Sequence, residues 1–407
     1  MKILVLNSGS SSQKIRLYDI GEALPEHPPA GLWEGKIEWS EKGAEVSIST
    51  PRSSVQKERV AAANRGAAIE HLLGRLWKGD QRAVESAASI DMVGHRVVHG
   101  GPEFERPVMI TAAVKSAIAK VSDFAPLHNR AELEGMQIIE KLLGAVPQAA
   151  VFDTGFHRQM PLPAVVYPGP YKWFEQGIRR YGFHGINHEY CARRAAQLLR
   201  KDLASLNLVT CHLGNGCSLA AIRGGKSVDT TMGFTPLEGL MMGTRSGSVD
   251  PGILTYLMRQ QNLSGEQLDD VLNKQSGLLG VSGISEDMRE IAAAMKKGTE
   301  RAKLAFDIYV HRLVSGIGAM VASLGGINAL IFTAGVGENS AEVRAEACEK
   351  LAFLDLRLDA ASNEKVSSEK PARDQDIAAA DSRVRVLVIR AQEEWAIARS
   401  CWLLKSS

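Results

Sequence analysis

Short apolar runs that end in glycine and small polar residues recur along this chain of 407 residues. Ile3–Leu6 is such a run, and Lys14–Tyr18 after it alternates polar and apolar residues, which predicts a hairpin with a wide polar loop. Residues 206–223 repeat the order of strand, glycine-rich turn and strand. The likeness of ILVLNSGSSSQKIRLYD to LVTCHLGNGCSLAAIRGGK suggests duplicated halves, although it is too short to establish a duplication by itself.

Other segments have the spacing of buried strands or of helices with one apolar face. A buried strand is expected near the end of residues 81–100, where the sequence is VGHRVVHGG. Further buried strands are expected at 149–152, 329–332 and 384–389. Helices are expected at 132–143, 189–199, 299–324, 341–351 and 392–404. Residues 25–66 predict edge strands and loops, and the polar residues 362–382 predict a loop. Near residue 155 the chain becomes rich in proline and aromatic residues, and we place a domain boundary there.

Composition is that of an ordinary soluble globular protein, with 45% hydrophobic and 23% charged residues. The formal net charge of +2 gives no strong attraction to nucleic acid or to a membrane surface. Apolar runs fall short of the roughly 18 residues of a membrane span, so we expect a cytoplasmic protein with neither partner. The cysteines lack a CxxC pair and are expected to be reduced and buried. They are Cys191, Cys211, Cys217, Cys348 and Cys401.

Three glycine-containing segments are candidates for binding phosphate. In Asn7–Ser12, followed by Lys14, small residues would let the backbone approach a phosphate and the lysine would add a charge. The alternative is an exposed flexible turn. His212–Gly216 follows a strand in the same way, although Asn-Gly also makes plain hairpins. The third segment, Gly335–Asn339, carries two glycines between a predicted strand and a predicted helix. This arrangement places anions at the N-terminus of the helix.

Gly225-Lys226-Ser227 is not a phosphate-binding P-loop. That motif needs a glycine five residues before Gly225, and Ala220 stands there. The triplet is expected in a hairpin turn.

Several charged residues and histidines stand beside glycines or at strand ends. Arg96 follows a buried strand segment, where an arginine needs an anionic partner or an exit to solvent. Each also has a structural alternative, an ion pair for an arginine and a hydrogen-bonded core position for a histidine. A metal pair at His95 and His99 is not expected, because they lie in a strand pattern. The other candidates are Asp153, His128, His184 and Arg245.

Taken together, these segments resemble the acetate kinase family, which lies within the actin-like ATPase and sugar-kinase superfamily. The matching stretches are NSGSSS with Lys14, GHRVVHGG, APLHN, FDTGFH, RRYGFHG, HLGNG, GFTPLEGLMMGTRSG, DMRE and FTAGVGENS. They stand in the family's order over nearly the whole chain. The resemblance implies two α/β domains of actin-like (ribonuclease H-like) fold, with a duplicated core and a nucleotide cleft between them. We expect residues 1–154 with the returning helix 391–407 to form one domain, and 155–390 the nucleotide-binding one.

The resemblance also implies a role for each candidate. Arg96 corresponds to the arginine for the substrate carboxylate, Asp153 to the catalytic aspartate, and His184 with Arg245 to the pair that stabilises the transition state. His128 corresponds to a further active-site histidine. The phosphate-side loop would use Ser10, Ser12 and Lys14, and magnesium (or manganese) would lie near Asn7 and Glu393. The implied nucleotide-binding residues are His212, Leu213, Gly214, Asn215 and Gly216, then Asp287, Met288 and Arg289, and finally Gly335, Val336, Gly337, Glu338 and Asn339.

Two departures from the family pattern lie near these positions. Arg390-Ala391-Gln392 stands before Glu393 where the family usually has Pro-Thr-Asn, and Ser248 replaces a usual acidic residue. Arg130 also replaces a common proline.

The expected activity is ATP-dependent phosphorylation of acetate to acetyl phosphate and its reverse, by direct transfer in a homodimeric enzyme. The carboxylate is already ionised at neutral pH, so no general base is needed, and Asp153 is expected to orient the metal, its waters or the arginines. Propionate or butyrate as substrate stays open, because one methylene is worth only about 1–3 kcal/mol in a pocket. An actin-like ATPase without acid kinase activity also stays open. A sugar kinase would need an aspartate base beside a hydroxyl, and Arg96 argues against that.

Overall fold

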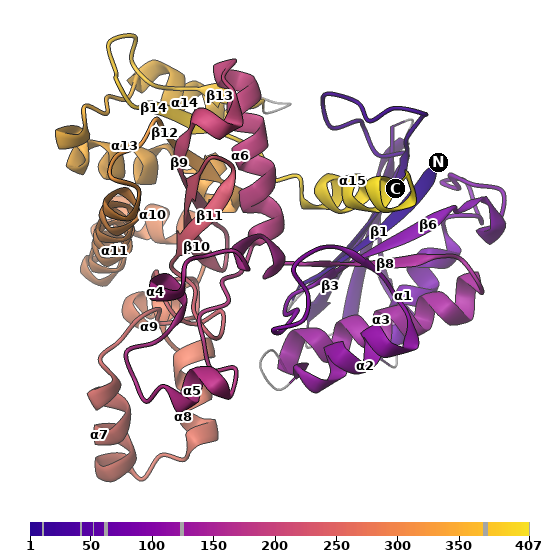
Figure 1. Ribbon diagram of the computed structural model, residues 1–407, viewed down its shortest axis with the longest axis horizontal. Helices are drawn as coiled ribbons and strands as arrows, with labels where there is room; N and C mark the ends of the chain where they lie inside the picture. Colours follow the sequence, from indigo (N-terminus) through magenta and orange to yellow (C-terminus); the bar gives the residue numbers. More distant parts are fainter. Residues whose placement is uncertain are drawn as a thin grey trace. The chain divides into compact units, whose positions relative to one another are not determined.

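The computed structural model describes residues 1–9, 12–40, 43–51, 53–60, 64–122, 126–368 and 373–406. The chain folds into two compact units. Met1–Phe156 with Gln392–Ser407 form the first unit, and His157–Ala391 form the second, so the chain passes between them twice (Figure 1). A short 3-10 helix, η3 (Gly155–His157), lies at the first passage.

The first unit is built on an eight-stranded sheet in the order β5-β4-β3-β2-β1-β6-β8-β7. Strands β1 to β5 are antiparallel neighbours, whereas β1, β6 and β8 run parallel. The strands are β1 (Lys2–Ser8), β2 (Ser12–Asp19), β3 (Trp33–Ser40), β4 (Gly43–Thr50), β5 (Ser53–Val60), β6 (Met92–Val97), β7 (Val108–Met109) and β8 (Gln148–Phe152). The helices are α1 (Arg65–Gly74), η1 (Ala87–Ser89), α2 (Ala112–Lys120), α3 (Pro126–Leu143) and α15 (Glu393–Ser406).

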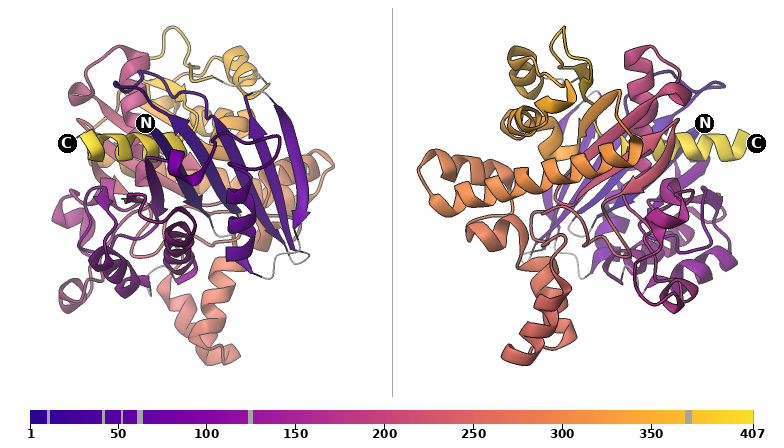
Figure 2. Two further views of the ribbon diagram at one scale, coloured as in Figure 1. Left: turned by 90° about the vertical axis from the view of Figure 1, so that its right-hand side faces the viewer. Right: turned by 60° about the vertical axis from the view of Figure 1, so that its left-hand side comes forward.

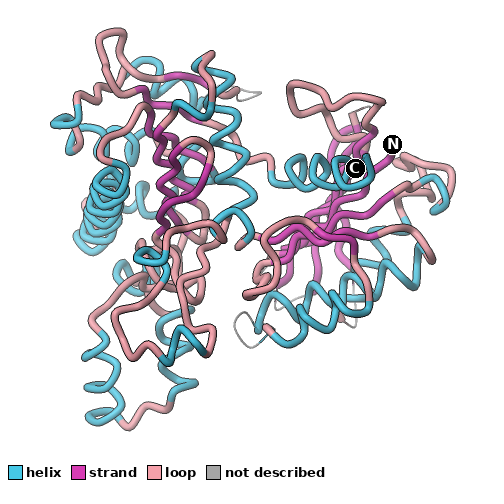
Figure 3. The backbone as a smooth tube through the Cα atoms, viewed as in Figure 1, coloured by secondary structure: helices cyan, strands magenta, loops and turns pink. Residues whose placement is uncertain are grey.

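Helices cover both faces of this sheet, as Figures 1 and 3 show. Helices α1 and α3 pack on one face over a core that includes Leu4, Leu6 and Leu72. The C-terminal helix α15 packs on the opposite face along β1 and β6. Its close approach requires a glycine, because a β-carbon on Gly94 would stand 2.6 Å from Cys401 Sγ and 2.7 Å from Ile397 Cγ2.

The second unit contains a six-stranded sheet in the order β11-β10-β9-β12-β14-β13. Helix α11 packs on one face and α6 on the other (Figures 1 and 2). The strands are β9 (Asn207–Leu213), β10 (Cys217–Arg223), β11 (Lys226–Thr230), β12 (Ala329–Thr333), β13 (Gln375–Asp376) and β14 (Arg385–Val388). The helices are α4 (Leu162–Val165), α5 (Lys172–Glu175), α6 (Gly185–Leu199), η4 (Leu203–Ser205), α7 (Pro251–Gln261), α8 (Gly265–Lys274), α9 (Gly277–Ser282), α10 (Met288–Lys296), α11 (Glu300–Leu324), α12 (Ala334–Asn339), α13 (Ala341–Lys350), η5 (Ala352–Leu354) and α14 (Ala360–Ser368).

The two sheets repeat one core. The order β3-β2-β1-β6-β8 in the first unit matches β11-β10-β9-β12-β14 in the second. In each case the first three strands are antiparallel, and the third runs parallel to the fourth and fifth. The predicted α/β class with a duplicated core is therefore confirmed.

Most predicted elements are confirmed, and the differences have physical causes. Helix α3 begins at Pro126, earlier than the apolar spacing indicated. The predicted loop 362–382 is wrong in part, because it overlaps α14 and contains β13. Helix α14 buries the polar residue Asn363, whose Oδ1 accepts from Arg344 Nε and whose Nδ2 donates to the carbonyl of Ala341. Its stability therefore comes from polar contacts that an apolar pattern does not reveal.

Three further expectations can be compared with the structure. All five cysteines are buried and reduced, as predicted. Gly225 lies in the turn between β10 and β11 with a positive φ of 79°, and Lys226 and Ser227 begin β11, so the triplet belongs to a hairpin as predicted. The sequence indicated no apolar run long enough to span a membrane. Helix α11 differs from that expectation, because its length and apolar composition alone would suffice to cross a membrane. The same properties are found in the core helix of a globular protein, and nine of its residues are buried in this unit.

We predict that Gly94→Ala loosens α15. The added methyl group would overlap Cys401 and Ile397, so the free energy of unfolding should fall by about 1–3 kcal/mol. Urea denaturation measures the change. Gly135→Ala in α3 is the control, since its methyl group would meet nothing within 4 Å and should raise stability by about 1 kcal/mol. Equal effects of the two substitutions would contradict the assigned contact.

Candidate functional site

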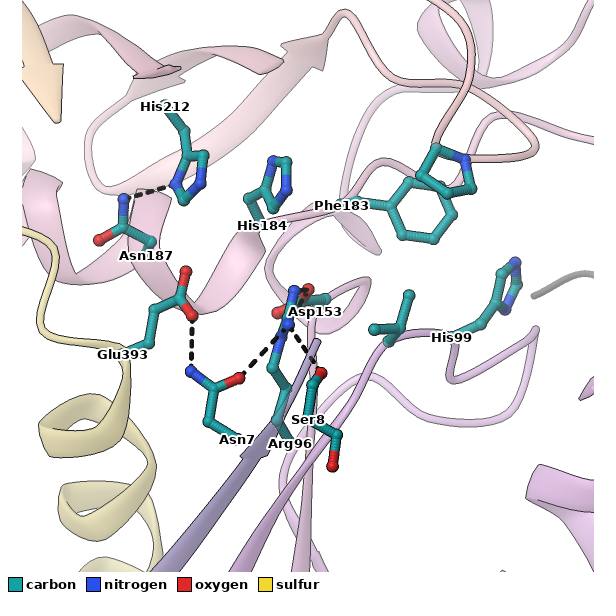
Figure 4. A network of polar contacts seen from close by, with 12 residues as sticks. Asn7, Ser8, Arg96, His99, Asp153, Phe183, His184, Asn187, His212 and Glu393 are labelled. Carbon is teal, nitrogen blue, oxygen red and sulfur yellow. Dashed lines mark hydrogen bonds and ion pairs between the residues drawn. The ribbon is translucent and has the colours of Figure 1, made fainter. Parts of the chain in front are cut away.

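In the first unit, three neighbouring strands bring together a buried arginine, an aspartate and an asparagine (Figure 4). Arg96 lies near the end of β6, Asp153 directly follows β8, and Asn7 lies near the end of β1. Arg96 donates to Asp153 Oδ2 from Nε at 3.1 Å and from Nη2 at 2.5 Å. Its Nη1 donates to the carbonyl of Ser8 at 3.2 Å and to Asn7 Oδ1 at 3.3 Å. Because the three strands run parallel, their carboxyl ends meet at one edge of the sheet.

This cluster keeps a cation nearly out of water. The Arg96 side chain is only 12% exposed and that of Asp153 only 1%. Burial by itself would lower the pKa of Arg96, but Asp153 and Glu393 outweigh it, and the net shift of the pKa is upward. Arg96 is therefore fully charged. The sequence predicted that an arginine here would need an anionic partner, and that partner is Asp153.

The N-terminus of α15 adds two adjacent carboxylates to the same edge. The Asn7 amide donates to Glu393 Oε2 and to Glu394 Oε1, each at 2.9 Å (Figure 4 draws the first). Glu394 also lies 3.9 Å from the ammonium of Lys14, whose side chain is 57% exposed on β2. The sequence analysis missed Glu394. Its only sequence signal was its position next to Glu393.

The described residues fit a magnesium ion that arrives with a nucleotide better than a closed protein site. No group of three or more His, Cys, Asp or Glu side chains in the described ranges could hold a metal ion. Magnesium commonly binds through one or two carboxylates, water and substrate phosphates. Glu393, oriented by Asn7, offers one such carboxylate. Of the two histidines considered as a metal pair, His95 bonds Gln148 through Nε2, and burial lowers the pKa of His95 to about 4.

A second buried acid lies behind Arg96. Glu132 on α3 is 2% exposed, and both its carboxylate oxygens lie 3.2 Å from the backbone nitrogen of Val98. Burial raises the pKa of Glu132 to about 8, although the charge of Arg96 lowers it. Glu132 therefore carries a proton over much of the neutral range. Sequence spacing gave no sign of this, because Glu132 reads as an ordinary helical glutamate.

The remaining predicted residues of this unit are less informative. Ser12 begins β2, and His128 lies in the first turn of α3. Ser10 lies outside the described residues.

In the second unit, three predicted residues face the turn between β9 and β10. A β-carbon on Gly216 would stand 3.4 Å from Arg245 Nη1 and 3.5 Å from His184 Nε2. A β-carbon on Gly214 would stand 3.5 Å from His212 Nε2. The two glycines thus let two imidazole edges and a guanidinium come close to the turn, and such donors and positive charge suit a phosphoryl group.

His184 is held in an uncommon backbone conformation at this turn. Its φ of 58° lies in the left-handed region, where it caps the N-terminus of α6. Such strain persists only where surrounding structure enforces it, and it is concentrated at functional sites. The imidazole of His184 stacks on that of His212, with ring centroids 4.0 Å apart and an angle of 10° between the planes (Figure 4).

A network that the sequence analysis missed holds the loop of Arg245. Arg245 Nη1 donates to the carbonyl of Pro236 at 3.0 Å. Two residues further on, Glu238 accepts from Arg180 at 2.6 Å and from the hydroxyl of Tyr167. Arg180 also donates to three consecutive carbonyls of residues 230–232. These contacts fix the segment from which Arg245 extends.

One of the other two predicted nucleotide-binding stretches adjoins the same turn. A β-carbon on Gly214 would lie 3.8 Å from Cβ of Ala334, the first residue of α12. The segment Gly335–Asn339 is itself the helix α12, rather than a loop before a helix as predicted. Asp287 caps the N-terminus of α10 and pairs with Arg289, whose side chain is 88% exposed.

Glu338 has a structural contact within this stretch. Its Oε1 accepts from the backbone nitrogens of Ala334 at 2.9 Å and Ala391 at 2.8 Å. Burial raises the pKa of Glu338. Arg390 lies 3.7 Å from the other carboxylate oxygen, so the departure at residues 390–392 provides a charge partner for Glu338.

Comparison with known proteins gives a consistent match over the whole chain. Residues 2–399 match the model of the acetokinase family. An acetate kinase of Cyanothece sp. is 59% identical over 406 residues, covering 99% of this chain and 98% of that protein. The crystal structure of Porphyromonas gingivalis acetate kinase is similar with a TM-score of 0.90 and 39% identity over 99% of both chains. A propionate kinase from Francisella tularensis is similar with a TM-score of 0.88 and 36% identity over 98% of both chains.

We predict that Glu132 makes stability depend on pH. Between the usual pKa of 4.5 and the raised value of about 8, the folded protein keeps a proton on Glu132 that the unfolded chain has lost. Stability therefore falls as pH rises through this range. Glu132→Gln should remove that part of the slope, which urea denaturation across the range measures. Glu140→Gln, on the exposed side of the same helix, should keep the wild-type slope, and an unchanged slope in Glu132→Gln would contradict the prediction.

Proposed function

Because the chain belongs to the acetokinase family, we propose that it is an acetate kinase that transfers the γ-phosphoryl group of ATP to the carboxylate of acetate, and the reverse. Its fold is the actin-like ATPase fold with a duplicated α/β core. The observation that best supports the proposal is the convergence of Arg245, His184 and His212 on the open turn at Gly214 and Gly216. The reaction also needs a cation that binds the acid, and the charged Arg96 of the first unit supplies it.

The reaction needs these cations because both reactants are anions. Two unit charges 4 Å apart repel by about 4 kcal/mol at an effective dielectric constant of 20. Planar guanidinium groups match carboxylate and phosphoryl oxygens better than ammonium groups do. We therefore assign Arg96 to the acetate carboxylate, and Arg245 with His184 to the phosphoryl group in transfer. Four of the five Arg96 N–H groups already donate to described residues, which leaves one on Nη2 to donate to acetate.

Asp153 orients the arginine in this proposal. Its Oδ2 accepts twice from Arg96, so it fixes the plane of the guanidinium group. It does not act as a base, because acetate is ionised at neutral pH. Transfer is direct and in line, with no phosphorylated enzyme intermediate.

ATP or ADP is assigned to the stretches at residues 212–216, 287–289 and 335–339 of the second unit. Magnesium, when bound with the nucleotide, would neutralise charge on its phosphates, and Glu393 oriented by Asn7 would hold it. Ser12 and Lys14 border the same edge of the first unit. Manganese has the same preference for oxygen ligands and is expected to substitute.

We propose a cytoplasmic homodimer. Helix α7 buries none of its residues, and Ile253, Tyr256 and Met258 expose between 45% and 56% of their surface. Exposed apolar faces of this kind support contact with a second copy. Analytical ultracentrifugation tests the dimer, and a monomer at micromolar concentration would contradict it.

The function is tested by trapping acyl phosphate with hydroxylamine. With ATP and magnesium, we expect acetate to give the highest kcat/KM in a series of unbranched acids from one to four carbons. Propionate should be used less well, by roughly 10- to 200-fold if one methylene decides. A preference for propionate or butyrate would change the substrate, and ATP hydrolysis without any acyl phosphate would identify an ATPase of the same fold.

We further predict that Arg245→Ala lowers kcat by about 10³-fold or more, because a charge-stabilising arginine in phosphoryl transfer is worth roughly 10³–10⁵. Arg245→Lys should recover only a small part, since an ammonium lacks the planar fork. Arg193→Ala on the exposed side of α6 removes an arginine that pairs with Glu189 of the same helix and serves as control. A loss smaller than tenfold in Arg245→Ala would rule out the assigned role.

A further inference from the structure

The two stacked histidines of the second unit raise the question of which ring nitrogen carries the proton. Both Nε2 atoms face the glycines of the turn at residues 214–216. A neutral imidazole donates from one nitrogen and accepts at the other, and the partner of Nδ1 decides which. Residues behind the rings therefore determine whether the turn is lined by N–H donors or by lone pairs.

For His212 the partner of Nδ1 is a donor. Asn187 Nδ2 lies 2.9 Å from His212 Nδ1. The orientation of this amide is supported by the thiol of Cys191, which donates to Oδ1, and in this orientation Nδ2 also donates to Thr333 Oγ1. His212 Nδ1 thus accepts, and neutral His212 carries its proton on Nε2, towards the turn.

For His184 the partner of Nδ1 is a hydroxyl in a buried chain. Ser218 Oγ lies 2.8 Å from His184 Nδ1 and 2.8 Å from His188 Nε2. His188 Nδ1 lies 2.6 Å from Thr210 Oγ1. Ser218, His188 and Thr210 are all fully buried. Burial holds the pKa of His188 well below its usual value, so this ring is neutral and has a single N–H.

Two proton arrangements fit these contacts. In the first, Thr210 donates to His188 Nδ1, His188 Nε2 donates to Ser218, and Ser218 donates to His184 Nδ1. In the second every donor is reversed, so His188 donates to Thr210 and His184 Nδ1 donates to Ser218.

The hydroxyl of Thr210 distinguishes the two arrangements. In the second arrangement the Thr210 hydroxyl hydrogen needs another acceptor, and Thr210 Oγ1 has no other hydrogen-bond partner in the described part of the chain. A buried donor without an acceptor carries a desolvation penalty. The first arrangement uses every hydrogen, and it leaves the His184 proton on Nε2.

We propose that Ser218, supported by His188 and Thr210, is a positioning residue that holds His184 in the Nε2–H tautomer. This inference rests on the proposed function, in which His184 contacts the phosphoryl group. With His184 and His212 in the same tautomer, two neutral N–H donors line the turn next to Arg245. An Nδ1–H tautomer would instead direct a lone pair of His184 towards an anionic oxygen, which repels it.

The tautomer can be read without measuring activity. In protein labelled with ¹⁵N-histidine, Nε2 of His184 should show the chemical shift and one-bond proton coupling of a protonated nitrogen, and Nδ1 those of an acceptor. His184→Gln identifies the signals. Wild-type protein with its proton on Nδ1 of His184 would overturn the proposal, whatever reaction the enzyme catalyses.

Kinetics test the positioning role. Ser218→Ala removes the donor to Nδ1, so we expect kcat to fall roughly 10- to 100-fold with little change in KM for ATP, and the His184 signals to show mixed tautomers. Ser218→Thr keeps the hydroxyl and should restore most of kcat. The matched control is Ser227→Ala, which removes a buried serine 2.7 Å from Nδ1 of His157, a histidine outside the proposed site.

The outcomes separate the inference from the proposed function. If the wild type forms no acyl phosphate, the proposed function fails, and the nitrogen spectrum still decides the tautomer. If Ser218→Ala folds and its kcat stays within twofold of wild type, or falls no further than that of Ser227→Ala, the positioning role is wrong. If Ser218→Ala does not fold, the wild-type spectrum and the Ser218→Thr variant decide.

Discussion

The ion pair between Arg96 and Asp153 is the interaction on which the first unit's site depends. A guanidinium at the carboxyl ends of three buried strands keeps its charge, and an anion beside it offsets the cost of burying that charge. Removing one partner of such a pair costs about 3–5 kcal/mol, because the other charge is left buried. The ends of β1, β6 and β8 are thereby tied together, and Asn7 extends the same contacts to Glu393 and Glu394 on α15. The C-terminal helix is connected to the site by hydrogen bonds as well as by its packing on Gly94.

The second unit uses the same strand order for a different kind of site. The turn after β9 occupies the place that the turn after β1 occupies in the first unit, and both follow a strand between an antiparallel and a parallel neighbour. Around the first lie charged side chains of both signs, among them Arg96, Asp153 and Glu393. Around the second lie imidazoles whose hydrogen bonds end in hydroxyl and amide groups, with Arg245 as the nearby cation. A duplicated core has thus supplied two turns, and the side chains behind each turn decide what it binds.

Sequence patterns predicted the strands well because β1, β6, β8, β9 and β12 are buried on both faces and read as short apolar runs. They also singled out Arg96, Asp153, His184 and Arg245 as candidates, through the motifs that carry the family resemblance. What they could not predict is the partner of each group. Glu394 looks like an ordinary helical residue until Asn7 and Lys14 are seen beside it. Glu132, Ser218 and Glu238 lie 34 to 71 residues from the partners that define them. Such pairings depend on tertiary contacts, which neither spacing nor periodicity reports.

The absence of a general base changes what the buried polar groups are for. An ionised acid needs no proton removed, so the reaction as proposed requires that donors and cations keep the protons they have. In the arrangement proposed here, the second unit meets this requirement with rings that are oriented by partners of fixed donor or acceptor character. A neutral N–H can donate to a phosphoryl oxygen in both directions of the reaction without being titrated by it. Arg245 and Arg96 remain charged at any physiological pH for a different reason, the high basicity of guanidinium. The proposed site is therefore one in which orientation of fixed donors, rather than proton transfer, lowers the barrier, and its precision depends on the buried contacts behind each donor.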